Sequence, residues 1–378
     1  MDILTSPELA IRSLLDEMRT KQASDLHISV GQRPMLRLNG DLVASDSHNE
    51  PLTPQETEAL ALAVLEPAKR TRFASGNAID FAFSVEGLAR YRGNVFRQRG
   101  AVSCAIRAIP LKVQPLAELA LPSVIGRIAD KERGLVLVTG PTGSGKSTTL
   151  AAMLDKINRN RAAHILTLED PIEHIHVHQR SLVNQREIGT DVDSFAEGLR
   201  SALREDPDVI LVGEMRDLET ISAALTIAET GHLCLATMHS HSAPEAINRI
   251  IDSFPHEQHA QIRQQLAATL EAVITQDLVP VDGGRARVAC CEILIANNAV
   301  QAAIREQKTA QIVSIIQTGS REGMQSMNTD LYRLVEQKRL SPEDAVRRSP
   351  RWQELSSELQ RGGFLRQNSS DRLGRVQR

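Results

Sequence analysis

The sequence predicts an α/β fold, in which helices cover both faces of a parallel β-sheet. Two observations support this prediction. Near-continuous apolar runs of strand length alternate with helical stretches, at residues 134–138, 164–168, 209–212 and 233–237. Directly after the first run, residues 140–147 read GPTGSGKS, which fits the phosphate-loop pattern G-x-x-x-x-G-K-[ST] at every position. A smaller α+β domain is expected before this core, and a set of helices after it.

The phosphate-loop motif lies between a predicted strand and a predicted helix, which is the context that its chemistry needs. Glycines let backbone N–H groups surround phosphate oxygens, and the positive end of the following helix favours an anion. We expect Lys146 to neutralise the β- and γ-phosphates of ATP, and the Ser147 hydroxyl to ligate Mg²⁺. The predicted nucleotide-binding residues are Gly140, Pro141, Thr142, Gly143, Ser144, Gly145, Lys146, Ser147 and Thr148.

The composition limits the other classes of function. With 378 residues, two or three domains are expected. The net charge of -3 creates no global field for nucleic acid, and 3% aromatic residues leave few platforms for stacking bases. The four cysteines form no C-x-x-C pair, so we expect reduced thiols and no zinc site. No apolar run reaches the length of a transmembrane segment, so a cytoplasmic protein is expected.

Residues 1–110 predict an α+β domain with an antiparallel sheet, and the proline-flanked residues 111–122 predict a linker. The strand expected over residues 89–99 carries Arg92 and Arg97, and the next strand carries Arg107. Two interpretations remain open for these arginines. They could form a solvated charged face, or they could contact an anion such as the γ-phosphate bound by a neighbouring subunit.

The residues just beyond the apolar strands are the candidates for catalysis, because ligands of such sheets bind at the carboxyl ends of the strands. Glu169 and Glu214 occupy these positions, and either could orient or deprotonate an attacking water. Each could instead be a solvated helix-cap acid. His232 and His239 flank the last strand, so they could sense the nucleotide or be structural.

The C-terminal third predicts mainly helices. One helical region is expected over residues 256–276, and further helices over 296–346. Residues 347–378 combine several arginines with Gly-Gly and Asn-Ser-Ser, which predicts a basic and largely disordered tail.

Four motifs together resemble those of the type II/IV secretion ATPases. They are the phosphate loop, TLEDPIE at 167–173, ALREDPDVILVGEMRD at 202–217, and the segment from Thr230 to His239. In this order they resemble the Walker A motif, Asp box, atypical Walker B motif and His box of that family. The chain is most similar to the type IV pilus retraction ATPases within it, over residues 21–332.

This resemblance implies a RecA-like P-loop ATPase core over residues 123–295 and a PAS-like N-terminal domain. It implies that Glu214 is the catalytic base or water-positioning residue, and that Glu169 helps to position Mg²⁺ or water. It also implies that His232 and His239 couple the nucleotide state to motion. The arginines of the PAS-like domain that would reach the nucleotide correspond to Arg92, Arg97 and Arg107.

The activity implied by the resemblance is that of a homo-hexameric motor, which hydrolyses ATP with Mg²⁺ to retract type IV pili in twitching motility. Its implied location is the cytoplasmic side of the inner membrane, against the pilus platform protein. Residues 299–306 read AVQAAIRE and resemble the retraction motif AIRNLIRE, from which they depart at 300–303. The paralogous retraction ATPase therefore remains open as an alternative identity and as a candidate partner.

Three alternative functions were weighed against pilus retraction. A pilus assembly or type II secretion ATPase is disfavoured, because such enzymes carry an additional N-terminal domain and a four-cysteine zinc insert. A RecA-like nucleic-acid motor has only the basic tail in its favour. A GTPase-like switch is disfavoured because the sequence contains no N-K-x-D tetrad for reading guanine.

Overall fold

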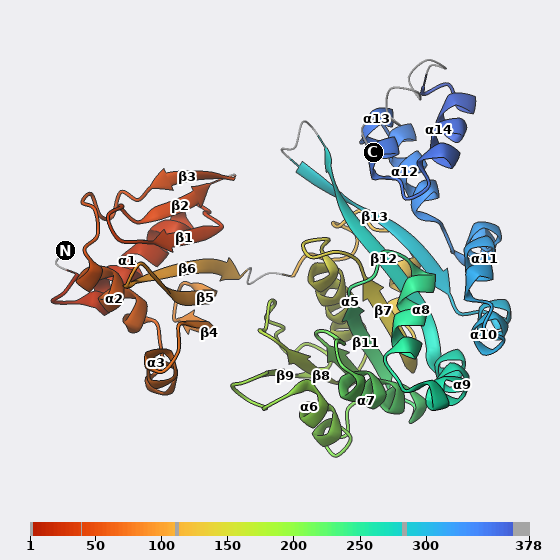
Figure 1. The fold of residues 1–378 in the computed structure, drawn as a ribbon, viewed down its shortest axis with the longest axis horizontal. Helices are drawn as coiled ribbons and strands as arrows, with labels where there is room; N and C mark the ends of the chain where they lie inside the picture. The colour runs from red at the N-terminus through yellow and green to blue at the C-terminus, as the bar shows by residue number, and fades with distance from the viewer. Residues whose placement is uncertain (1–2, 39, 110–112, 282–285, 366–378) are drawn as a thin grey trace. The chain divides into compact units, whose positions relative to one another are not determined.

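The computed structural model describes residues 3–38, 40–109, 113–281 and 286–365 (Figure 1). The chain divides into two compact units, which are described separately. Unit 1 comprises Met1–Lys112 together with Pro171–Ile175, and unit 2 comprises Val113–Asp170 and His176–Arg378. Residues 113–122, the greater part of the expected linker, belong to unit 2, and Leu116 and Leu121 among them pack against its core.

Unit 1 contains a six-stranded antiparallel sheet with helices packed against it. The strand order is β3-β2-β1-β6-β5-β4. The strands are β1 (Asp25–Ile28), β2 (Met35–Leu38), β3 (Asp41–Ala44), β4 (Ala78–Val85), β5 (Ala89–Gln98) and β6 (Ala101–Ile109). The helices are α1 (Pro7–Thr20), α2 (Pro54–Ala63) and α3 (Pro67–Ala74). α2 begins at a capping box, in which the Thr53 hydroxyl accepts from the backbone N–H of Glu56 and the Glu56 carboxylate accepts from that of Thr53.

Unit 2 is built on a seven-stranded sheet in the order β13-β12-β7-β11-β10-β8-β9. The strands are β7 (Gly134–Thr139), β8 (His164–Glu169), β9 (Leu182–Glu187), β10 (Val209–Val212), β11 (Leu233–Met238), β12 (Leu270–Val281) and β13 (Ala286–Ile295). Neighbouring strands are parallel except β12 and β13, which form an antiparallel hairpin. The predicted α/β class is confirmed.

Helices cover both faces of this sheet (Figure 1). They are α4 (Val124–Ala129), α5 (Lys146–Asn160), α6 (Phe195–Ala202), α7 (Leu218–Glu229), α8 (Ala243–Asp252) and α9 (His259–Thr269). Along β7, Leu135 and Leu137 belong to one hydrophobic cluster, and Val136 and Val138 belong to another. Because successive side chains point to opposite faces, both faces of β7 are buried, which explains its continuous apolar sequence.

The helix expected over residues 256–276 ends earlier than predicted. α9 stops at Thr269, and β12 begins at Leu270. The strand contains three consecutive β-branched residues, Val273, Ile274 and Thr275, of which Val273 and Ile274 pair with Leu137 and Val138 of β7. Burial between β7 and β13 favours strand over helix here, which is a tertiary effect that local periodicity does not contain.

The C-terminal helices are α10 (Asn298–Arg305), α11 (Ile312–Thr318), α12 (Met327–Glu336), α13 (Pro342–Arg348) and α14 (Trp352–Arg361). The last three, the C-terminal three-helix group, pack on the projecting end of the β12–β13 hairpin (Figure 1). The prediction of disorder from residue 347 onward is therefore wrong for 347–361. Leu355 and Leu359 of α14 are fully buried in this group. The remaining predicted tail, 366–378, lies outside the described residues.

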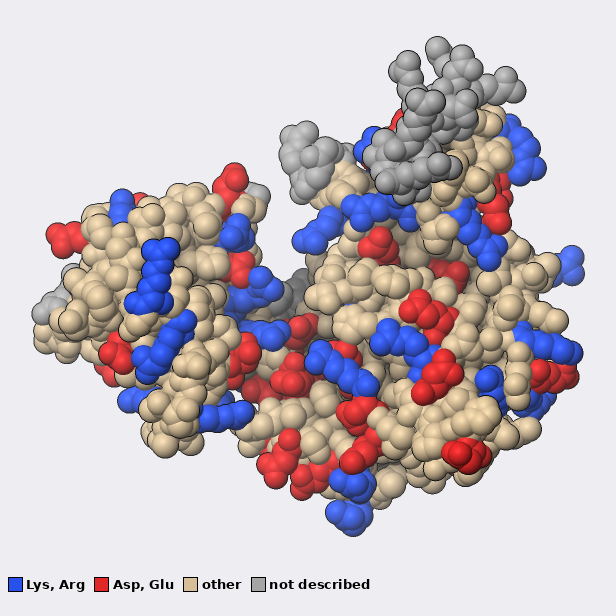
Figure 2. Space-filling view, viewed as in Figure 1, with Lys and Arg blue, Asp and Glu red and all other residues tan. Residues whose placement is uncertain are grey.

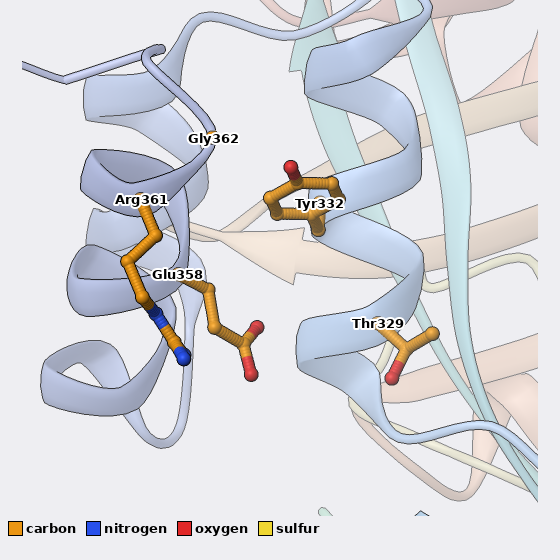
Figure 3. A pocket seen from close by; sticks show the side chains of 5 residues that line it. All are labelled: Thr329, Tyr332, Glu358, Arg361 and Gly362. Carbon is orange, nitrogen blue, oxygen red and sulfur yellow. The ribbon is translucent and has the colours of Figure 1, made fainter.

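A cavity of about 450 Å³ lies between α12 and α14 (Figure 3). Thr329 and Tyr332 line it from α12, and Glu358, Arg361 and Gly362 line it from the other side. None of these residues belongs to the predicted nucleotide site. Among the residues that the structure describes, no helix is both long enough and apolar enough to cross a membrane.

Candidate active site

The predicted nucleotide-binding residues form one continuous loop and the first turn of α5. β7 ends at Thr139, and α5 begins at Lys146 after Gly145, whose φ of 86° is left-handed. Gly140 has a φ of 140°, and a Cβ there would lie 2.1 Å from the carbonyl oxygen of Gln276. Both positions therefore require glycine. The Nζ of Lys146 donates to the carbonyl oxygens of Gly140 and Pro141, at 3.0 Å each.

Glu169 lies at the carboxyl end of β8, where two side chains fix its carboxylate. The hydroxyl of Thr167 donates to Glu169 Oε1 at 2.6 Å, and Nε2 of Gln185 donates to the same oxygen at 3.1 Å. Gln185 comes from the neighbouring strand β9. The sequence analysis missed Gln185, because only the pairing of β8 with β9 brings it to Glu169.

Glu214 follows β10, and its carboxylate forms an ion pair with Arg216 and contacts the ring of His239. Nη2 of Arg216 lies 2.6 Å from Oε2, and Nε2 of His239 lies 3.1 Å from Oε1. Burial by itself would raise the pKa of Glu214. The hydrogen bond from Arg216 and the charges of Arg216, His239 and Lys146 all lower the pKa. Together they outweigh burial, so the pKa of Glu214 lies below its usual value. The carboxylate is therefore ionised at neutral pH.

The ends of β10 and β11 are held together by main-chain and side-chain bonds. The Thr237 hydroxyl donates to the carbonyl of Gly213, and the N–H of Met215 donates to the carbonyl of Thr237 at 2.9 Å. Arg249 of α8 donates to the carbonyl of His239. These bonds place Glu214 and His239 next to each other at the same edge of the sheet.

His232 does not join the other site residues within unit 2. It precedes β11, and its carbonyl accepts from the N–H of Gly134 at the start of β7. Its ring lies 3.0 Å from the Thr230 hydroxyl and 3.2 Å from the carbonyl of Ile227. Since a strand rises about 3.3 Å per residue, β11 separates His232 from His239 by roughly 20 Å. Of the two predicted histidines, His239 is the one that lies beside Glu214 in this unit, and the coupling role of His232 stays a prediction.

The predicted arginines lie in unit 1, and each has a partner there. Arg92 lies 3.9 Å from Glu173, and Arg107 Nε donates to Asp25 at 2.7 Å. The guanidinium of Arg97 lies over the ring of Phe73, 5.0 Å from its centroid. Arg92 and Arg107 are also directly opposite each other in the pairing of β5 with β6.

This pairing of like charges is unfavourable unless acidic groups or an anion offset it. The Asp25 carboxylate is one such group. Burial would raise its pKa, but hydrogen bonds from Ser24 and Arg107 hold the pKa below its usual value. No local pattern indicates that Asp25 faces Arg107, since 82 residues separate them.

The donor set at the loop fits Mg²⁺ bound mainly through phosphate and water. The Ser147 hydroxyl is in the first turn of α5, and Glu169 is at the adjoining edge of the sheet. Among the described residues, no group of three or more His, Cys, Asp and Glu could hold a metal ion. Mg²⁺ needs no such group, because it retains waters and uses few protein ligands beside a nucleotide.

Comparison with known proteins agrees with the geometry. A family model described as "Type II/IV secretion system protein" matches residues 118–329. The type IV pilus retraction ATPase PilT of Pseudomonas aeruginosa is 49% identical over 335 residues, which cover 89% of this chain and 96% of that protein. The type IV pilus ATPase PilU of the same bacterium is 39% identical and covers 89% and 88%. The crystal structure of the pilus retraction motor PilT with bound ADP has a TM-score of 0.85 at 43% identity, covering 92% and 98%.

The chain therefore belongs to the type II/IV secretion ATPases, and unit 2 contains their α/β RecA-like nucleotide-binding core. The chain is more similar to this PilT than to this PilU. Within its family the chain is a PilT-like pilus retraction ATPase.

Proposed function

We propose that this chain works as a Mg²⁺-dependent, ring-forming motor in which ATP hydrolysis drives pilus retraction. The observation that carries the proposal is the convergence of the phosphate loop, Glu169 and Glu214 at the carboxyl ends of the parallel strands β7, β8 and β10. This is where a nucleotide binds in such a sheet, and both carboxylates are held in place by neighbouring side chains.

The proposed mechanism assigns one task to each group. Lys146 leaves the loop carbonyls and binds the β- and γ-phosphates, because a phosphate is the stronger partner for an ammonium group. Ser147 supplies the hydroxyl that would hold Mg²⁺, whose charge neutralises the transferred phosphoryl group when it is bound. Glu169 orients water next to this position. The ionised carboxylate of Glu214 orients or deprotonates the attacking water.

Six copies of the chain form the proposed ring. In it, Arg92, Arg97 and Arg107 of one copy approach the nucleotide that another copy binds. An arginine supplied in this way can raise turnover by about 10³–10⁵-fold. The pairing of Arg92 with Arg107 supports this role, since it brings two cationic side chains close enough together to contact one phosphate. We further propose that the ring acts on an inner-membrane pilus platform protein and is peripheral to that membrane.

A nucleic-acid motor is not favoured. Figure 2 shows Lys and Arg side chains interspersed with Asp and Glu on the visible face of each unit. Phosphate backbones are bound by surfaces of mainly one sign. Neither the net charge of -3 nor this mixed surface offers that electrostatic attraction.

A gene deletion, complemented with wild type, Lys146→Ala or Lys131→Ala, tests the proposed function. Lys131 is an exposed residue paired with Glu271, so Lys131→Ala is the matched control. We expect the deletion strain to carry excess pili and to lose twitching motility, and only wild type and Lys131→Ala to restore it. Purified Lys146→Ala should retain its fold by circular dichroism and lose ATP turnover. Absent pili in the deletion strain would indicate an assembly ATPase instead, and retained turnover in Lys146→Ala would remove the assigned role of the loop.

A further inference from the structure

Gln276 is a buried polar side chain directly behind the phosphate loop. It lies on β12, is 2% exposed, and follows Thr275, which pairs with Thr139 at the end of β7. The hydroxyls of Thr139 and Thr275 are 2.9 Å apart and fix this register. Gln276 is thereby placed beside Gly140, the first residue of the loop.

Both ends of the Gln276 amide bind the nucleotide-binding segment. Nε2 donates to the carbonyl oxygen of Ser144 at 2.7 Å, and Oε1 accepts from the Thr149 hydroxyl at 2.7 Å. Ser144 is in the loop, and Thr149 is in the first turns of α5. One side chain therefore connects the loop to the helix that follows it.

The bond to Ser144 also determines where the loop presents an N–H group. In a planar trans peptide the C=O and the N–H point in opposite directions. Because the Ser144 carbonyl is turned toward β12, the N–H of Gly145 is turned away from β12, to the side on which a loop of this kind binds phosphate.

Two glycines of the motif allow this approach. A Cβ at Gly140 would lie 2.1 Å from the Gln276 carbonyl oxygen, and a Cβ at Gly145 would lie 2.8 Å from Gln276 Nε2. These contacts are shorter than real Cβ atoms tolerate. The glycines are thus needed for close contact with Gln276 as well as for phosphate binding.

We propose that Gln276 is a positioning residue of the nucleotide site, which holds the phosphate loop and the start of α5 in the conformation that binds phosphate. The proposal rests on the nucleotide-binding role of the loop. A core-packing role would need only an apolar side chain of the same volume, whereas here both amide atoms bond to the loop and helix on either side of Lys146.

The test compares Gln276→Met with Gln325→Met in the full-length protein. Methionine retains the length and approximate volume of glutamine and removes both hydrogen bonds. Gln325 is the matched control, because its Nε2 donates to a main-chain carbonyl, that of Cys291, at 2.8 Å, away from the loop. ADP affinity is measured by titration calorimetry, and hydrogen exchange is followed in residues 140–149.

We expect Gln276→Met to weaken ADP binding about 10- to 100-fold, which corresponds to about 1.4 kcal/mol per factor of ten. KM for ATP should rise by a similar factor while kcat falls less, because the loop holds phosphate in the ground state and the transition state alike. The rate of amide hydrogen exchange should increase in residues 140–149. Gln325→Met should change the affinity for ADP by less than about twofold relative to wild type.

A purely structural role predicts a different result, in which both variants lower the melting temperature and neither changes ADP affinity by more than about twofold. That result would overturn the proposal. If Gln276→Met does not fold, Thr149→Val removes only the second bond and should still weaken ADP binding severalfold. Wild type that fails to bind ADP would contradict the proposed function itself, whereas normal binding by wild type and by the Gln276 variants alike would contradict only this inference.

Discussion

At the scale of single residues, the chemistry of the site depends on the partners of each carboxylate. Burial and the hydrogen bond from Arg216 act on the pKa of Glu214 in opposite directions, and the bond together with nearby positive charge prevails. Arg216 is two residues beyond Glu214 in the sequence, so it was within reach of a sequence-based prediction. Its contact with the carboxylate was visible only in the structure.

This balance makes the activity of Arg216→Met depend on pH. The variant loses the hydrogen bond and the charge, so burial prevails and the pKa of Glu214 rises. Since the ionised carboxylate is the active form in the proposed mechanism, turnover should fall first at acidic pH, and the acid limb of kcat should move to higher pH. The measurement is kcat between about pH 5 and 9. Arg200→Met, which removes an exposed arginine 4.0 Å from Glu219, should leave the limb in place. An unmoved limb in Arg216→Met would show that Glu214 is not the group that titrates.

At the scale of elements, α14 shows why composition misled the prediction for the C-terminus. Residues 347–378, which include this helix, combine several arginines with Gly-Gly and Asn-Ser-Ser, and that composition is typical of disorder. The apolar residues of α14 are few but spaced to share one helical face, with Trp352, Leu355 and Leu359 at intervals of three and four. These side chains pack against α12 and the β12–β13 hairpin, so tertiary contacts supply the stability that composition did not predict.

Leu355→Ala should therefore destabilise the C-terminal three-helix group by about 2–4 kcal/mol, because it leaves a cavity in a buried cluster. Denaturant unfolding and limited proteolysis measure this effect, and new cleavage sites should appear within 342–361. Gln353→Ala, on the exposed face of the same helix, should change stability by less than about 0.5 kcal/mol. Equal protease resistance in both variants would mean that α14 does not depend on this packing.

At the scale of the whole molecule, the site residues are divided between two units with separate cores. Unit 1 has its own hydrophobic cluster, centred on Leu26, Tyr91 and Ile106, and unit 2 has the clusters around its sheet. Unit 1 carries the predicted arginines, and unit 2 carries the phosphate loop and both glutamates. This separation suits the proposed ring, because unit 1 of one copy could then respond to the nucleotide that unit 2 of another copy binds.

Mixing two inactive variants tests whether the arginines act between copies. Arg97→Ala should lower kcat more than ADP affinity, because its charge would act mainly in the transition state. Lys146→Ala should be inactive for lack of phosphate binding. When the two are mixed and allowed to exchange, some sites combine an intact Lys146 with an intact Arg97 from another copy, so ATPase activity should reappear. Arg12→Ala, which removes an exposed arginine bonded to the Glu86 carbonyl, should stay active throughout. Mixtures that stay inactive would mean that Arg97 does not act on the nucleotide bound by another copy.

The sequence alone determined the parallel α/β core and the phosphate loop, because both are encoded in short local patterns: apolar runs, helical periodicity and one eight-residue motif. It also placed Glu169, Glu214 and His239 at one edge of the sheet, since each lies within two residues of the end of a strand that could be recognised. Only the tertiary structure decided that residues 270–281 form a strand, and that Gln185 and Gln276 support the site. Those features depend on which strands become neighbours, and strand pairing joins residues far apart in the chain, where local periodicity carries no information.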